Sequence, residues 1–156
     1  MLFTDVLDMA KPIIHQAEAL LVKSRLNPAA TVVSAHDDVL NFQDIVRKVP
    51  VAEEIVRYAV RLAAASRPHQ ETTPDFLNEW ASWGAGTRAG QFLVLGGKVR
   101  ALLKGRAHVT VDDVRALAQP TLRHRILLNY RAEAEGITVA EVIKRLLDGV
   151  KPPLGV

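Results

Sequence analysis

The chain has 156 residues, of which 49% are hydrophobic and 5% aromatic; this suffices for the core of one compact domain and excludes a disordered chain. The absence of cysteine excludes disulfides and thiolate metal sites, and the scarcity of aromatic residues favours a helical bundle over a β-sandwich. With 20 basic and 17 acidic residues the net charge is +3, which indicates either a mild preference for anions or simply a well-solvated surface.

The first expected helix covers residues 5–26, where apolar residues recur every three or four positions and Pro12 starts, kinks or breaks the pattern. Residues 27–36 are expected to be a connector with a short extended piece at Val32 and Val33. No apolar stretch reaches the ~18 residues of a membrane span, and the N-terminus lacks the pattern of a secretory signal. We therefore expect a cytoplasmic protein without a membrane span.

The next two helices are expected at residues 37–46 and 50–67. Asp37 and its neighbour place acids at the start of the first helix, where they complement unpaired N–H groups. Pro50 suits the first turn of the second helix. The apolar stripe of this second helix, with Val60 at its edge, is wide enough to contact more than one neighbour.

Thr73-Pro74-Asp75 predicts the start of a short helix, with Thr73 as its cap, that runs through Trp80 to Trp83. Residues 84–86, with two glycines, end it. The helical pattern resumes over residues 87–104, where close approach of another helix is the simplest reason for Gly96 and Gly97. Its inward stripe is expected to be Phe92, Leu95, Val99, Leu102 and Leu103.

Two more helices follow. Residues 110–113 (TVDD) open one, which Pro120 interrupts before the pattern continues to Leu127. Thr138 and Glu141 form a capping-box pattern that opens the last helix. Because no run alternates over the length of a strand, the sequence predicts an all-α fold.

The chain lacks the phosphate loop that an ATPase needs. Gly97-Lys98 resembles the end of the pattern GxxxxGK[ST], but Phe92 replaces its first glycine and Val99 replaces its Ser or Thr. Without the glycine loop and the hydroxyl that holds Mg²⁺, we expect no ATP hydrolysis by this chain alone.

Metal and acid–base sites are also poorly supported. His15 with Glu18, and His36 with the two aspartates that follow it, provide too few ligands for a metal site. Paired acids such as Asp112 and Asp113 stand where helix N-termini favour them. We expect no metal site and no catalytic residue.

The most informative stretch is residues 83–89, WGAGTRA, in which a glycine-bearing turn leads into a helix whose first turn carries Arg88. Small residues let another backbone or a ligand come close, and the helix N-terminus favours an anion. A guanidinium there matches phosphate oxygens. The alternative is that Arg88 pairs with an acid and the glycines form a plain turn.

This stretch and the residues after it resemble the lid of the MoxR family of AAA+ ATPases, and the resemblance extends over roughly residues 32–150. The family pattern combines G-A-[SG]-P-R-A, G-R-x-x-V-[ST]-x-x-D-[VI] and A-x-P-x-L-x-H-R. The residues that match it are Gly84, Ala85, Gly86, Arg88, Ala89, Gly105, Arg106, Val109, Thr110, Asp113, Val114, Ala118, Pro120, Leu122, His124 and Arg125.

The resemblance implies that residues 31–156 form a helical AAA+ lid and that residues 1–30 are an additional helical segment of unclear origin. It implies that Arg88 is the sensor-2 arginine, supported by the loop Gly84, Ala85, Gly86 and Thr87. ATP and Mg²⁺ would be held by a core domain that this chain lacks, in a homo-oligomeric, chaperone-like ring. Thr87 stands where the family usually has Pro, so the approach to Arg88 is less rigid.

Two other functions stay open at this stage. One is a stand-alone helical adaptor that binds only protein partners. The other is a nucleic-acid-binding module, whose affinity would fall steeply with salt. The basic residues that would follow a nucleic-acid backbone are Arg100, Lys104, Arg106, Arg115, Arg123 and Arg125.

Overall fold

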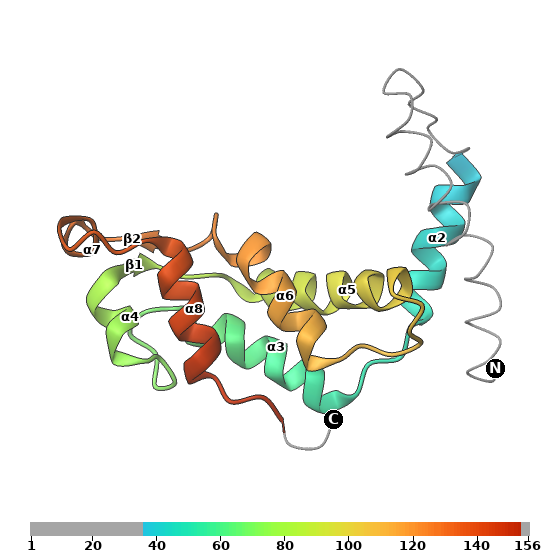
Figure 1. The fold of residues 1–156 in the computed structure, drawn as a ribbon, viewed down its shortest axis with the longest axis horizontal. Coiled ribbons are helices and arrows are strands. Elements are labelled where there is room, and N and C mark those ends of the chain that lie inside the picture. The colour runs from blue at the N-terminus through green and yellow to red at the C-terminus, as the bar shows by residue number, and fades with distance from the viewer. Residues whose placement is uncertain (1–35, 154–156) are drawn as a thin grey trace. The chain divides into compact units, whose positions relative to one another are not determined.

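The computed structural model describes residues 36–153. The predicted segment 1–30, with its helix at 5–26, and the extended piece at Val32 and Val33 lie outside this range. Within it the chain is helical apart from two short strands, which confirms the predicted fold class (Figure 1). In chain order the elements are α2 (His36–Lys48), α3 (Glu53–Ala65), α4 (Asp75–Trp80), β1 (Ala81–Trp83), α5 (Thr87–Leu103), α6 (Val111–Leu122), β2 (Leu127–Leu128), α7 (Tyr130–Ala134) and α8 (Val139–Gly149).

The described residues divide into two compact units. The first contains residues 36–50 and 98–109, and the second contains residues 51–97 and 110–153. Helix α5 therefore contributes its beginning to the second unit and its end to the first.

In the first unit, α2 buries Ile45 and Val46, and the Lys98 ammonium donates a hydrogen bond of 2.8 Å to the Arg47 carbonyl oxygen. Helix α5 ends here at Leu103, and Gly105 in the turn that follows has a φ of +65°, which a glycine adopts without strain. The N–H groups of Gly105 and Arg106 bond back to the carbonyls of the last helical turn, each at 2.8 Å. The Gly-Arg pair of the family pattern is thus the C-terminal cap of α5.

The core of the second unit is formed by α3, α6 and α8, which pack against one another (Figure 1). The prediction that α3 contacts more than one neighbour is therefore confirmed, although Val60 of its expected stripe is 54% exposed. The fully buried side chains of these three helices include Ile55, Tyr58, Leu62, Val114, Ala118, Leu122, Val142, Ile143 and Leu146. Burial of each large side chain among them contributes about 1.5–3 kcal/mol to the free energy of folding.

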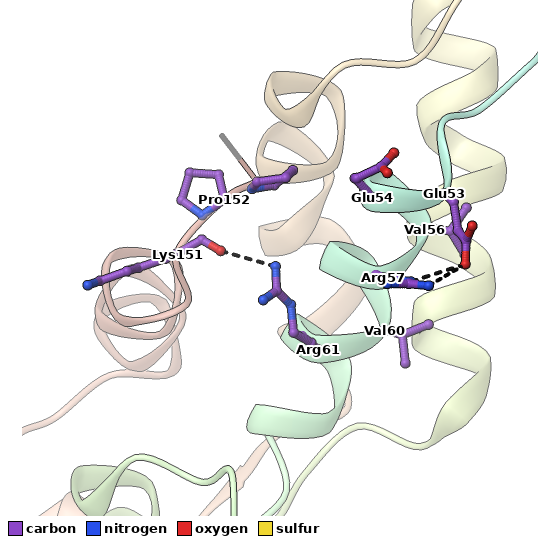
Figure 2. Close-up of a pocket in the computed structure, with 9 residues that line it drawn as sticks. Glu53, Glu54, Val56, Arg57, Val60, Arg61, Lys151 and Pro152 are labelled. Carbon is purple, nitrogen blue, oxygen red and sulfur yellow. Dashed lines mark hydrogen bonds and ion pairs between the residues drawn. The ribbon is translucent and has the colours of Figure 1, made fainter. Parts of the chain in front are cut away.

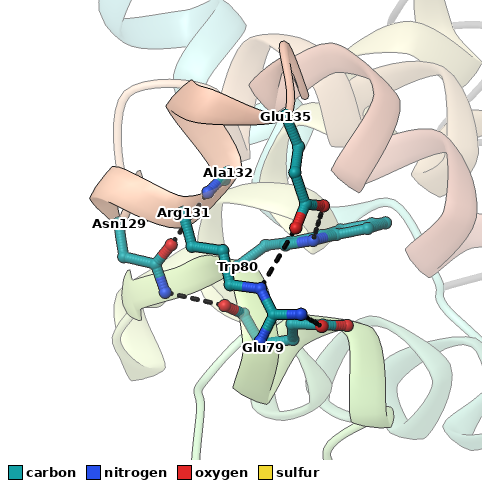
Figure 3. A network of polar contacts seen from close by, with 6 residues as sticks. All are labelled: Glu79, Trp80, Asn129, Arg131, Ala132 and Glu135. Carbon is teal, nitrogen blue, oxygen red and sulfur yellow. Dashed lines mark hydrogen bonds and ion pairs between the residues drawn. The ribbon is translucent and has the colours of Figure 1, made fainter.

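A polar network joins α7 to α4 in the same unit (Figure 3). The Trp80 indole N–H donates to Glu135 at 3.0 Å, and the Arg131 guanidinium binds Glu79 and Glu135. The Asn129 side chain caps α7 by accepting the Ala132 N–H and also donates to the Glu79 carbonyl at 2.7 Å. These contacts hold α7 and the strand before it against α4.

The strands β1 and β2 were not predicted. They pair antiparallel, with Ala81 opposite Leu128 and Trp83 opposite Leu127. The prediction that Trp83 continues the helix of α4 is therefore wrong, since the helix ends at Trp80. Strands of two and three residues are too short to show an alternating pattern in the sequence.

Pro120 does not interrupt α6, contrary to the prediction, because it lies in the last turn of a helix that ends at Leu122. A proline removes the hydrogen bond to the carbonyl four residues earlier, here that of Ala116. Ala116 is exposed, so water can satisfy that carbonyl, and the hydrogen bond at the C-cap, from Arg123 N–H to Gln119 O, is intact at 3.1 Å. The cost of the proline is therefore confined to the helix end.

Local signals placed most helix starts correctly. Residues 110–113 open α6 as predicted, and they form a capping box in which the Thr110 N–H donates to the Asp113 carboxylate at 3.0 Å. At the predicted capping box of α8, the Thr138 hydroxyl accepts the Glu141 N–H at 3.2 Å, which is one of the two bonds of that pattern. Two starts are displaced: Pro50 precedes the first residue of α3 by three positions, and α4 has Pro74 rather than Thr73 as its N-cap. The Thr73 hydroxyl instead donates to the Arg67 carbonyl.

The inward face of α5 was assigned incorrectly. Of the stripe expected to be buried, Phe92, Leu95 and Leu103 are 48%, 45% and 50% exposed, and only Leu102 is fully buried. In the second unit α5 instead buries Ala89 and Leu93. This helix is apolar on nearly every side, so periodicity alone could not identify the face that packs.

Candidate functional site

The loop between β1 and α5 begins at Gly84, which lies directly against the end of α3. A Cβ atom at this position would come within 2.1 Å of the Ser66 carbonyl oxygen and 2.5 Å of the Arg67 Cα. Real Cβ atoms do not approach backbone this closely, so only glycine fits. The small residues expected to allow a close approach therefore allow the approach of another segment of backbone.

Ser66, which the sequence analysis did not identify, anchors this loop. Its side chain is fully buried, and its hydroxyl donates to the Ala63 carbonyl at 2.7 Å. The same hydroxyl accepts the Ala85 N–H at 3.0 Å, and Ala85 is itself fully buried. A lone serine after an alanine-rich helix has no sequence signal that would reveal a partner 19 residues away.

Helix α5 begins at Thr87, immediately after the loop. Thr87 is thus the first helical residue and not the cap that precedes the helix, a position that Gly86 occupies. The Gly86 carbonyl accepts the Ala89 N–H at 3.0 Å, and nothing lies within 4 Å of the position of a Cβ at Gly86. The entrance to the helix is therefore open to solvent.

Arg88 is the second residue of α5, and its side chain is exposed. Among residues 36–153, no carboxylate forms an ion pair with the Arg88 guanidinium, and no acid lies in the first turn of α5. The alternative in which Arg88 pairs with an acid is therefore not found in the described part of the chain. The structure brings together Gly84, Ala85, Gly86, Thr87 and Arg88 at one exposed helix N-terminus fixed to the end of α3.

A groove of the second unit lies elsewhere, between α3 and residues 151–153, with a volume of about 1090 Å³ (Figure 2). Val56 and Val60 form part of its wall. Its charged side chains are largely engaged, because Arg57 pairs with Glu53 at 2.6 Å and Arg61 donates to the Lys151 carbonyl at 3.3 Å. Nothing in this arrangement defines a ligand.

Other expectations concern metals, nucleic acid and membranes. No group of three or more His, Asp or Glu residues in the described range is arranged to hold a metal ion. Of the basic residues considered for nucleic acid, Arg115 is engaged inside the fold, where it donates to the Leu147 carbonyl at 2.9 Å and lies 3.7 Å from Asp148. None of the helices in residues 36–153 is long and apolar enough to cross a membrane.

Comparison with known proteins identifies the class of domain. The family model of the AAA lid domain matches residues 78–146, a range that includes the Gly84–Arg88 loop and the whole of α5 and α6. The chain therefore carries an AAA lid domain.

Its relatives identify the type of lid. The chain is 32% identical to the chaperone MoxR1 of Mycobacterium tuberculosis over 126 residues, which are 81% of this chain and 33% of MoxR1. It is 27% identical to the uncharacterized protein YeaC of Bacillus subtilis over 142 residues, 90% of this chain and 42% of YeaC. A crystal structure of a putative ATPase from Cytophaga hutchinsonii superimposes with a TM-score of 0.70 and 33% identity, covering 75% of this chain and 36% of that one. The chain belongs to the lid domains of MoxR-type AAA+ ATPases.

These matches also give the share of each relative that the chain covers. The chain spans about a third of the length of MoxR1 and of the Cytophaga structure. The match to YeaC leaves only a tenth of the chain outside it, so it must include part of residues 1–30.

Proposed function

We propose that this lid serves an ATP-hydrolysing AAA+ core and that Arg88 is its sensor-2 arginine, which reaches the phosphates of a nucleotide held by that core. The observation that carries the proposal is the exposed guanidinium of Arg88 at a helix N-terminus, which pairs with no carboxylate among residues 36–153. Such a group binds phosphate oxygens through a fixed fork of N–H donors, and the positive end of the helix dipole adds to the attraction.

The surroundings of Arg88 differ from those of three other arginines in the second unit. Arg57, Arg131 and Arg145 each pair with a glutamate four residues away along the chain. The residues four before and four after Arg88 are Gly84 and Phe92, which offer no carboxylate. Binding a phosphate at Arg88 therefore breaks no ion pair with the part of the chain that the structure describes.

The hydrogen bond between Ser66 and Ala85 is the basis for the proposed coupling between Arg88 and the orientation of the lid. Because Ala85 is bonded to Ser66 and Gly84 lies against the same backbone, the N-terminus of α5 is tied to the end of α3. A force on Arg88 is thus transmitted to the packed helices and not absorbed by a loose loop. Nucleotide binding or loss at Arg88 would then change the orientation of the lid by shifting a population of two states.

ATP and Mg²⁺ belong to the core in this proposal, since the chain has no phosphate loop of its own. We infer a homo-oligomeric, chaperone-like ring in the cytoplasm, formed by the full-length ATPase. The isolated chain is expected to show no ATP turnover. Magnesium-dependent hydrolysis by the purified chain would overturn this assignment.

The decisive experiment adds the purified 156-residue chain to the core of MoxR1 from which its own lid has been removed, and measures kcat for ATP. Wild-type chain is expected to stimulate turnover, and Arg88→Ala is expected to lower the stimulated kcat by at least about tenfold. Arg57→Ala is the matched control, because Arg57 is also an exposed helical arginine, on α3. Equal stimulation by wild type and Arg88→Ala would remove the sensing role.

A further inference from the structure

An exposed apolar stripe continues from Arg88 along α5. Phe92 and Leu95 follow Arg88 at four and seven residues, so the three side chains lie on one side of the helix. Phe92 is 48% exposed and Leu95 is 45% exposed. Single exposed apolar residues are common, but an aromatic and a leucine in line with an unpaired arginine form a patch.

The opposite side of α5 already has its partners within the second unit. Ala89 and Leu93 are fully buried, and a Cβ at Gly90 would lie 3.6 Å from the Val60 Cα of α3, an ordinary contact distance. A Cβ at Gly96 would lie 2.9 Å from a methyl group of Leu117 on α6. The stripe of Arg88, Phe92 and Leu95 is thus a side of α5 that this unit leaves partly exposed.

A second cation lies on this stripe. The Arg125 guanidinium stacks over the Phe92 ring, 5.2 Å from its centroid, and donates to the Thr121 carbonyl. Among the described residues no carboxylate forms an ion pair with Arg125. Stacking orients a guanidinium while leaving N–H donors at its edge for another acceptor. We call Arg88, Phe92, Leu95 and Arg125 the Phe92 face.

We propose that the Phe92 face is the surface on which the ATPase core docks and that Arg125 is a positioning residue that meets an anionic group of the core. This inference rests on the proposed function. Phe92 follows Arg88 by one helical turn, a rise of about 6 Å. A phosphate held inside a folded domain and reached by Arg88 must therefore bring the surface of that domain over Phe92.

The relatives support an ATPase core, and not a small anion free in solution, as the partner that covers the Phe92 face. MoxR1 and the Cytophaga protein are about three times as long as the part that this chain matches, so most of each lies outside the lid. A free anion would satisfy Arg88 but leave Phe92 and Leu95 in water. A core with an apolar patch beside its nucleotide would cover Phe92 and Leu95 and also provide anionic partners for the two arginines.

The first test is a binding titration between the full chain and the lidless MoxR1 core, without nucleotide. Phe92→Ser and Leu95→Ser are each expected to weaken binding by about tenfold, as central apolar contacts of an interface do. Val60→Ser is the matched control, since Val60 is similarly exposed on α3, and is expected to change Kd less than twofold. Unchanged affinity of Phe92→Ser, or no binding of the wild-type chain, would overturn the docking proposal.

The same titration separates this proposal from nucleotide sensing. Arg88→Ala is expected to retain nucleotide-free binding to within about threefold while losing the stimulation of kcat. Loss of binding by Phe92→Ser together with full activity of Arg88→Ala would support docking and refute sensing. Unchanged binding of Phe92→Ser together with lost stimulation by Arg88→Ala would refute docking and leave the sensing role intact.

A photo-crosslink identifies the occupant directly. With p-benzoylphenylalanine in place of Phe92, irradiation of the mixture is expected to join the chain to the core, whereas the same replacement of Val60 is not. For Arg125, Arg125→Ala is expected to weaken binding and Arg125→Lys to restore it only in part, because lysine lacks the planar fork. A crosslink from Phe92 to a second copy of the chain would refute core docking and assign the face to self-association.

Discussion

The Ser66 hydroxyl accepts a hydrogen bond from the Ala85 backbone N–H at 3.0 Å. Both residues are fully buried, and the bond joins the end of α3 to the loop that presents Arg88. The candidate site is thus built on a contact between two small residues, neither of which would touch a nucleotide.

Ser66→Ala is expected to destabilise the protein by about 1–3 kcal/mol, because the buried Ala85 N–H would lose its acceptor. Chemical denaturation measures this change. Ser82→Ala is the control, since Ser82 is exposed on β1, and it is expected to stay within about 0.5 kcal/mol of wild type. Equal stability of the two variants would show that Ser66 does not anchor the loop.

Gly84→Ala and Gly86→Ala form a matched pair within the same loop. A methyl group at residue 84 would collide with the Ser66 carbonyl, whereas one at residue 86 meets nothing within 4 Å. We expect Gly84→Ala to cost about 1–3 kcal/mol and Gly86→Ala to change stability by less than about 1 kcal/mol. Thermal unfolding of the two proteins checks the order, and a less stable Gly86→Ala would contradict the structure.

Asp113→Ala is expected to lower the free energy of unfolding by about 1–3 kcal/mol. The Asp113 carboxylate is fully buried and accepts hydrogen bonds from both the N–H and the hydroxyl of Thr110, each at 3.0 Å. Asp112→Ala removes a neighbouring acid that is exposed in the same helical turn. Its loss should cost less than about 1 kcal/mol, the value of a charge near a helix N-terminus. A comparable loss in both variants would show that the capping box does not stabilise α6.

The free energies of unfolding of Arg88→Ala and Arg88→Lys are expected to lie within about 0.5 kcal/mol of that of the wild type. The reason is that the exposed guanidinium has no partner in the described chain. Their effects on the ATPase core should nevertheless differ. Lysine retains the charge without the planar fork, so Arg88→Lys should keep part of the stimulation that Arg88→Ala loses. A large loss of stability in either variant would mean that Arg88 has a structural partner.

Much of the local structure followed from the sequence. Residues 110–113 and the capping-box pattern at Thr138 placed two helix starts, since the groups that form these bonds lie within three residues of one another. The loop of residues 84–88 was also recognised in advance, because its glycines and arginine match a family pattern in order and spacing. The position of Ser66 was not, since its bond to Ala85 spans 19 residues.

The tertiary structure decided which sides of the helices meet. Along α5, Phe92 and Leu93 are adjacent and equally apolar in the sequence, yet Leu93 is fully buried and Phe92 is 48% exposed. The pairing of Trp83 with Leu127 likewise joins residues far apart in the chain. The sequence by itself determined the all-α class, the starts of α6 and α8, and the family, because these depend on neighbours within a few positions. Only the packing of α3, α6 and the start of α5 decided the outer face of α5, because burial depends on which distant side chains fill the same space.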